Sequence, residues 1–241
     1  MKYRMIITLL FPTLFLSCSK STEPAYDLNN DQFEFILYDG LKASQIINVK
    51  AALGNNNRRI TNDLEVQTMP KVTVKIWSDY DNFMQAMEDD IGTRYVGAAE
   101  YIYSISEFRI FYNQQVAVAA VHEFAHLVSM QINSSIVNNP RWLWEAVALY
   151  ENNEFVDPKT LSYMMSGNYP TLDELNANYN SGFQYIYSVG YILLEYIVHT
   201  WGMDTVIQLI QKNGNVTRVL GLTVQEFEAG WYEFVEQKYL N

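Results

Sequence analysis

The first hydrophobic pattern in the chain has helical spacing. Apolar residues recur every three to four positions from Asn29 to Leu53, which predicts a helix there. The run Gly54–Asn57 follows and predicts the end of that helix. From Lys71 to Trp77 apolar and polar residues alternate with period two, which predicts a strand with one buried face.

The later pattern changes from strand to helix. Ser78 or Asp79 can cap a helix that extends to about Asp90. Residues 95–112 are rich in β-branched and aromatic side chains and predict one or two strands. Helical spacing then dominates, and it predicts helices near 114–133, 142–153, 171–177, 183–200, 203–213 and 223–239. Strands early and helices late predict an α+β fold with two lobes, residues 29–113 and residues 114–241.

The N-terminal residues have the pattern of an export signal. A short basic stretch precedes an apolar run from Met5 to Leu16, which is too short to span a bilayer. The following Leu14–Cys18 segment resembles the lipobox of bacterial lipoproteins. That resemblance implies a signal peptide of residues 1–17, acylation of Cys18 and a polar tether over residues 18–28. The expected location is the bacterial cell envelope, exported and anchored to a membrane through the lipid, facing either the periplasm or the surface.

Composition and charge narrow the class of protein. The 241 residues are 49% hydrophobic and 18% charged, which excludes an intrinsically disordered chain. The net charge of −11 and the lack of a basic run argue against nucleic-acid binding. Cys18 is the only cysteine, so no intrachain disulfide can form. Lipid attachment explains this unpaired thiol, and an ordinary signal peptide with an incidental cysteine is the alternative.

One motif carries chemistry. His122-Glu123-Phe-Ala-His126 lies in a stretch that has good helix formers and no glycine or proline. In a helix, side chains four residues apart share a face, so both imidazoles can bind one cation, and neutral histidine nitrogens suit zinc. Glu123 projects about 100° further round the helix. Its carboxylate can therefore take a proton from a water molecule at the open side of the metal.

A catalytic zinc needs a third protein ligand and one open position. Glu145 is the best candidate, and eighteen residues separate it from His126. The spacing allows the first helix to end near Asn133 and the chain to reverse before Pro140. A second helix can then return antiparallel and present Glu145 to the metal.

The chain resembles a known family at this point. HExxH followed after eighteen residues by glutamate is the spacing of gluzincin metallopeptidases, and Trp142–Tyr150 is similar to the W-L-x-E-G-x-A-x-Y segment of small bacterial peptidases of that clan. The resemblance covers about residues 71–239. It implies a two-lobed zincin fold with a small mixed sheet and helices in the N-terminal lobe, a mainly helical C-terminal lobe, and the active-site helix between them. It also implies a tyrosine donor to the oxyanion, with Tyr185 the first candidate and Tyr187 the second.

Two further expectations come from the same family. A strand just before the metal-binding helix edges the cleft and pairs with the substrate backbone, which would assign Tyr101–Tyr112 that role. Residues 97–101 are faintly similar to the aminopeptidase G-x-M-E-N segment, which would make Glu100 the anchor of a free amino terminus. His199 is a poor catalytic candidate, because fourteen residues of continuous helix would place it about 21 Å from Tyr185.

The leading hypothesis is a zinc metallopeptidase that hydrolyses proteins or peptides outside the cytoplasm. Alternatives are a gluzincin aminopeptidase, a surface lipoprotein that keeps the zincin fold but binds its ligand without turnover, and a structural zinc site. The intact Glu123 argues against binding alone. Structural zinc sites usually have four protein ligands, which argues against the last alternative.

Overall fold

The computed structural model describes residues 31–177 and 184–241. In these residues the chain is 59% helical, with ten α-helices and a mixed sheet of four strands, which confirms the predicted α+β class. The strands are β1 Phe33–Leu37, β2 Val72–Trp77, β3 Glu100–Ser104 and β4 Glu107–Phe111. The helices are α1 Ile47–Asp63, α2 Tyr80–Ile91, α3 Val116–Ile132, α4 Arg141–Glu151, α5 Ser162–Met165, α6 Leu172–Leu175, α7 Ile186–Trp201, α8 Met203–Gln211, α9 Val216–Leu220 and α10 Val224–Val235.

The predicted signal peptide, Cys18 and the tether lie outside the described residues. Among the residues that are described, none of the helices combines the length and apolar character needed to cross a bilayer.

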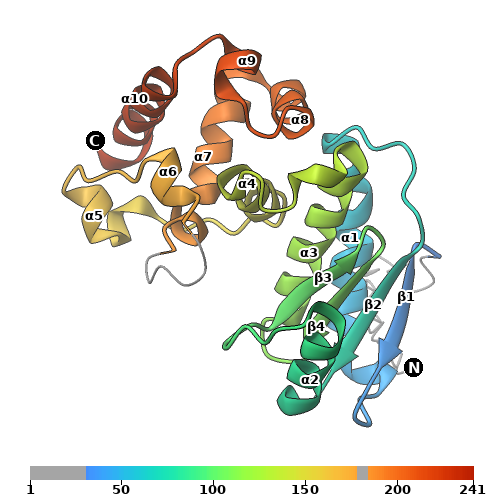
Figure 1. Cartoon of the computed structure of the whole chain (residues 1–241). Coiled ribbons are helices and arrows are strands. Elements are labelled where there is room, and N and C mark those ends of the chain that lie inside the picture. Colours follow the sequence, from blue (N-terminus) through green and yellow to red (C-terminus); the bar gives the residue numbers. More distant parts are fainter. Residues whose placement is uncertain (1–30, 178–183) are drawn as a thin grey trace, which may run out of the picture.

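The sheet has the order β1-β2-β4-β3, with β1, β2 and β4 parallel and β3 antiparallel to β4 (Figure 1). Alternate residues of β2, starting at Val72, belong to the main core together with residues of α1 and α3. At one end of the opposite face, Trp77 and Tyr101 pack with Phe83 of α2. The sheet is therefore covered on one face by α1 and α3, and α2 covers part of the other.

The first predicted helix is wrong in its N-terminal half. Residues 33–37 form the edge strand β1, whose apolar residues Phe33, Phe35 and Leu37 alternate with more exposed positions. The parallel pairing with β2 selects the strand, and that partner lies more than thirty residues further along the chain. The helix α1 begins at Ile47 and continues through Gly54–Asn57 to Asp63, because buried Leu53 and Ile60 keep one face of it in the core.

Other predicted elements are confirmed with small shifts in their bounds. Asp79 caps α2 by accepting a hydrogen bond from the Asn82 amide at 2.9 Å. The predicted strand region forms the hairpin of β3 and β4. Short helices α5 and α9 were not predicted, since four or five residues are too few to show a period. The start predicted for α7 at residue 183 lies outside the described residues.

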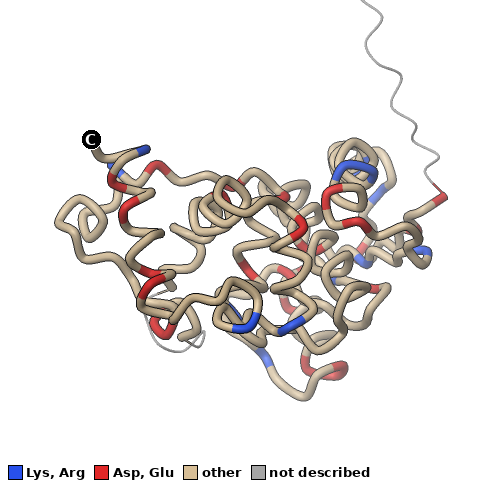
Figure 2. The backbone as a smooth tube through the Cα atoms, turned by 90° about the horizontal axis from the view of Figure 1, so that it is seen from above, with Lys and Arg blue, Asp and Glu red and all other residues tan. Residues whose placement is uncertain are grey.

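The helices after α3 pack on one another beyond the sheet (Figure 1). Helix α4 lies between α3 and α7 and packs against both. Gly190 of α7 sits close to Ala146 of α4, where an added Cβ would be 3.2 Å from the Ala146 Cα. Acidic residues are spread along the molecule from the sheet to the C-terminal helix (Figure 2).

Candidate metal centre

The central helix α3 carries the HExxH motif. It begins after Asn113, whose side-chain oxygen accepts a hydrogen bond from the Gln115 amide at 2.7 Å. Its neighbours make the helix a core element, and Glu123 and His126 are only 6% and 3% exposed. Burying ionisable groups costs free energy unless they find partners, so their surroundings decide what they can do.

The three motif side chains converge, and Glu123, which the sequence predicted beside the metal and not as a ligand, belongs to the group. Ligand atoms of His122, Glu123 and His126 all lie within 4.8 Å of one another, and this group could hold a metal ion. After α3 the chain reverses through a 3-10 turn at Ser134–Ile136, and α4 returns from Arg141. Helix α4 packs against α3, which brings Glu145 to the two histidines.

Glu145 of α4 lies next to both histidines of this group. Its Oε2 lies 3.4 Å from Nε2 of His122 and 3.7 Å from Nε2 of His126. Ligand atoms of a tetrahedral zinc at about 2.0–2.1 Å are roughly 3.3–3.4 Å apart, so these two separations are close to those of a bound ion. The donor set of two imidazoles and one carboxylate fits a metal of this kind.

The other side of the His122 ring is held by Glu154. Its Oε1 is 2.8 Å from Nδ1 of His122, and it also accepts a hydrogen bond from Asn152 Nδ2 at 2.8 Å. Helix α4 ends at Glu151, and Glu154 lies beyond it in contact with a predicted ligand.

His126 is enclosed by aromatic packing. Its ring stacks on that of Trp144 with centroids 3.8 Å apart and planes 6° apart. Its Nδ1 is buried and has no hydrogen-bond partner among the described residues. Burial lowers the pKa of His126 to about 4, so the imidazole is neutral at neutral pH, the form that binds metals.

The carboxyl groups have divergent pKa values. Burial raises the pKa of Glu123 to about 8, although the attraction of His122 opposes this. Burial also disfavours ionisation of Glu145, but hydrogen bonds from His122 and His126 outweigh it and hold the pKa well below its usual range. Burial would lower the pKa of His122, but its contacts with Glu145 and Glu154 raise it. The carboxyl groups of Glu123 and Glu145 are both buried, and their different partners give them different pKa values.

The two tyrosine candidates lie in different surroundings. Tyr187 donates a hydrogen bond to Oε1 of Glu145 at 3.4 Å, and its ring lies 5.4 Å from the Arg141 guanidinium. Tyr185 immediately precedes α7, and its ring packs against Tyr163 with centroids 4.9 Å apart. The structure therefore places Tyr187, the second choice from the sequence, in contact with a predicted ligand.

Glu100 and His199 are the other two residues that the sequence analysis considered. Glu100 is the first residue of β3 and is exposed. Surrounding protein raises its pKa, and its charge interacts with those of His122, Glu145 and Glu154. His199 is near the end of α7, where its ring contacts Phe234 at 5.5 Å. His199 is exposed.

No protein-family model, no curated protein and no solved structure matches this chain. The assignment of the site therefore depends on its own residues and geometry.

Sequence reasoning missed Glu154 and the stacking partner Trp144. Spacing along one helix could reveal neither, because Glu154 lies beyond the helix end and Trp144 acts through its ring face. One local signal was available for Glu154: asparagines at 152 and 153 mark a helix end, after which a side chain can turn back toward the preceding helix.

Proposed function

We propose that the protein is a zinc-dependent metallopeptidase of the gluzincin type. The supporting observation is the convergence of Nε2 of His122, Nε2 of His126 and Oε2 of Glu145, with the Glu123 carboxyl beside them. Two nitrogens and one oxygen are a donor set of catalytic zinc, which keeps its fourth position for water or substrate. The arrangement of sheet, α3 and C-terminal helices fits the two-lobed zincin fold that we infer.

The chemistry divides between the metal and the chain. A zinc ion in this position would polarise the substrate carbonyl and lower the pKa of a water molecule toward 7. A cation at the centre would favour the ionised form of Glu123, which accepts the proton of the attacking water as the new carbon–oxygen bond forms. The same carboxyl then donates that proton to the leaving amine as the peptide bond breaks, so it acts as base and then as acid.

A hydrogen-bond donor is also needed for the oxyanion that develops on the carbonyl. The hydrogen bond from the Tyr187 hydroxyl to Glu145, a proposed ligand, supports Tyr187 as this donor. We therefore prefer Tyr187 to Tyr185 for this role.

We infer that the substrates are peptides or proteins outside the cytoplasm and that the lipid on Cys18 holds the enzyme at a membrane of the bacterial envelope. The lipobox similarity of Leu14–Cys18 supports this location. The acidic net charge of −11 agrees with a peptide substrate rather than nucleic acid.

Substitution of Glu123 by glutamine tests the enzyme mechanism. Glutamine keeps the size and polarity but cannot accept the proton. We expect Glu123→Gln to bind one zinc per chain, as the wild type does, and to lose about 10²–10⁴-fold in turnover of a peptide library.

His126→Ala is the matched control and should lose both zinc and turnover. Undiminished hydrolysis by Glu123→Gln would contradict the mechanism. Zinc binding by the wild type without hydrolysis of any peptide would instead indicate a binding protein.

A further inference from the structure

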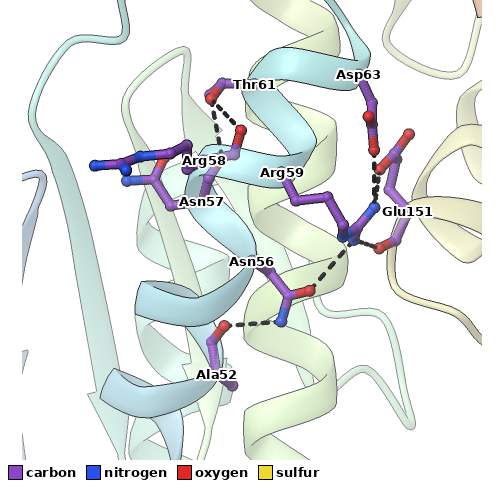
Figure 3. A network of polar contacts seen from close by, with 8 residues as sticks. All are labelled: Ala52, Asn56, Asn57, Arg58, Arg59, Thr61, Asp63 and Glu151. Carbon is purple, nitrogen blue, oxygen red and sulfur yellow. Dashed lines mark hydrogen bonds and ion pairs between the residues drawn. The ribbon is translucent and has the colours of Figure 1, made fainter. Parts of the chain in front are cut away.

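Residues of α1 and α3 both contact the end of α4. Arg59 of α1 extends to Glu151, the final residue of α4, and its Nη1 lies 2.6 Å from the Glu151 Oε2 (Figure 3). The Nη2 of the same guanidinium donates to the backbone carbonyl of Glu151. One side chain from α1 therefore holds both the side chain and the backbone at the end of α4.

Residues of its own helix orient the Arg59 side chain. Asp63, one turn later, lies 3.2 Å from Nη1, and Asn56 Oδ1 accepts from Nη2 at 3.3 Å. The neighbouring Arg58 points away from Glu151 (Figure 3). The side chain of Glu151 is fully buried, and Arg59 provides its ionic contact.

The backbone after Glu151 turns in a defined way. Asn153 has a positive φ of 58°, its amide donates to Tyr150 O at 3.0 Å, and the Glu154 amide donates to Leu149 O at 2.8 Å. These paired bonds form a Schellman motif, which fixes the residues after a helix relative to its last turn. The position of Glu154 thus follows from that of Glu151.

Glu154 is the residue that holds the Nδ1 of His122, at 2.8 Å. Asn152 strengthens this link, because its Nδ2 donates to Glu154 and also, at 2.9 Å, to the Val118 carbonyl on α3. A continuous series of short contacts therefore connects Arg59 on α1 with a predicted metal ligand on α3. Partners that orient a ligating histidine typically change metal affinity 10–100-fold when they are removed.

We propose that Arg59 is a positioning residue for the metal centre: it holds the last turn of α4 so that Glu154 meets His122 Nδ1, and it thereby raises the affinity for the metal. This inference rests on the proposed zinc site. It assigns a role in that site to a residue of α1, a helix that contributes no predicted ligand.

The test is the affinity for Zn²⁺, measured by competition with a chromophoric chelator, in the full chain. We expect Arg59→Gln to weaken binding about tenfold. The control Arg58→Gln removes the same charge from the adjacent position of α1 and should leave the affinity unchanged. Arg59→Lys keeps a cation against Glu151 but lacks the second donor, so its affinity should lie between those of the wild type and Arg59→Gln.

A double-mutant cycle separates positioning from general destabilisation. In the Glu154→Gln background, Arg59→Gln should cause little further loss of affinity, because the contact that it supports is already weakened. An equal loss in both backgrounds would overturn the inference, and so would wild-type affinity in both Arg59→Gln and Arg59→Lys. Urea unfolding without metal identifies any variant that fails to fold, and Arg59→Lys then carries the comparison. If the wild type binds no Zn²⁺, the proposed function itself fails; if it binds and Arg59→Gln binds equally, only this inference fails.

Discussion

The His122 imidazole has a different partner on each nitrogen. Nε2 faces the Glu145 carboxylate across the predicted metal position, and Nδ1 contacts Glu154. This arrangement selects the ring orientation and keeps Nε2 available for a metal, as outer partners of metal-bound histidines do. His126 is positioned differently, by the face of Trp144.

The contact of Glu154 with His122 gives a prediction for metal affinity. Glu154→Gln removes the charge of the acceptor and should weaken Zn²⁺ binding about 10–100-fold while leaving the fold intact. Chelator competition measures the effect. Glu34→Gln, an exposed position on β1, is the control and should bind zinc as the wild type does. Equal affinities for Glu154→Gln and the control would show that His122 needs no such partner.

Buried Glu151 gives a prediction for the pH dependence of stability. Burial raises its pKa to about 7, against the attraction of Arg59, whereas the unfolded chain has a value near 4.5. The native state therefore binds more protons between these values. The contribution of Glu151 to stability is full below pH 4.5 and is lost as pH rises through 7. Over this interval the free energy of unfolding falls by at most about 1.4 kcal/mol per pH unit.

Urea unfolding from pH 5 to pH 8 in the presence of a chelator checks this prediction. The free energy of unfolding of the wild type should fall relative to that of Glu151→Gln over this interval. A difference that stays constant with pH would show that Glu151 ionises in the native state as readily as in the unfolded chain.

At the scale of elements, the packed pair α3 and α4 provides the predicted ligands, and α7 packs against α4 as well. The contact between α4 and α7 depends on a glycine. A Cβ added to Gly190 would lie 2.6 Å from Cδ1 of Leu149 and 3.2 Å from the Ala146 Cα. Leu149 can change rotamer, but the Ala146 backbone cannot move without displacing the adjacent Glu145.

We therefore expect Gly190→Ala to destabilise the protein by about 1–3 kcal/mol, despite the better helix propensity of alanine. Thermal unfolding measures this, and Zn²⁺ affinity should fall at the same time. Thr200→Ala, exposed on the same helix, should stay within about 0.5 kcal/mol of the wild type. Full stability in Gly190→Ala would mean that α4 and α7 can separate at little cost.

At the scale of the whole molecule, the proposed metal would join α3 and α4, which are otherwise held together by packing and polar contacts. The sheet contributes no predicted ligand, yet α1 and α3 share its core. The polar contacts from Arg59 to His122 connect a helix that covers the sheet with the residues that follow α4. Metal binding should therefore stabilise the fold as a unit.

Zinc at about a thousand times its dissociation constant should add about 4 kcal/mol to the free energy of unfolding. For a chain of this size the corresponding rise in Tm is about 8–16 °C. Differential scanning calorimetry with zinc and with a chelator measures this shift. In His126→Ala the shift should vanish, and its persistence there would place the metal elsewhere.

The sequence by itself determined the features that depend on local spacing. The alternation of Val72, Val74 and Ile76 predicted a strand, and the four-residue interval of the motif placed His122 and His126 on one helix face. The eighteen residues before Glu145 predicted the reversal that brings this carboxylate back to the histidines. These features follow from backbone geometry within one or two elements, so a single chain pattern can specify them.

Tertiary structure decided what depends on distant partners. Residues 33–37 became a strand because β2 offered a parallel partner, and α1 continued past Gly54 because Leu53 and Ile60 reach the core. The roles of Glu154 and Arg59 arise where three helices meet. The free energy of such contacts is gained only when segments separated by tens of residues pack together. Hydrophobic periodicity within one segment therefore cannot predict them.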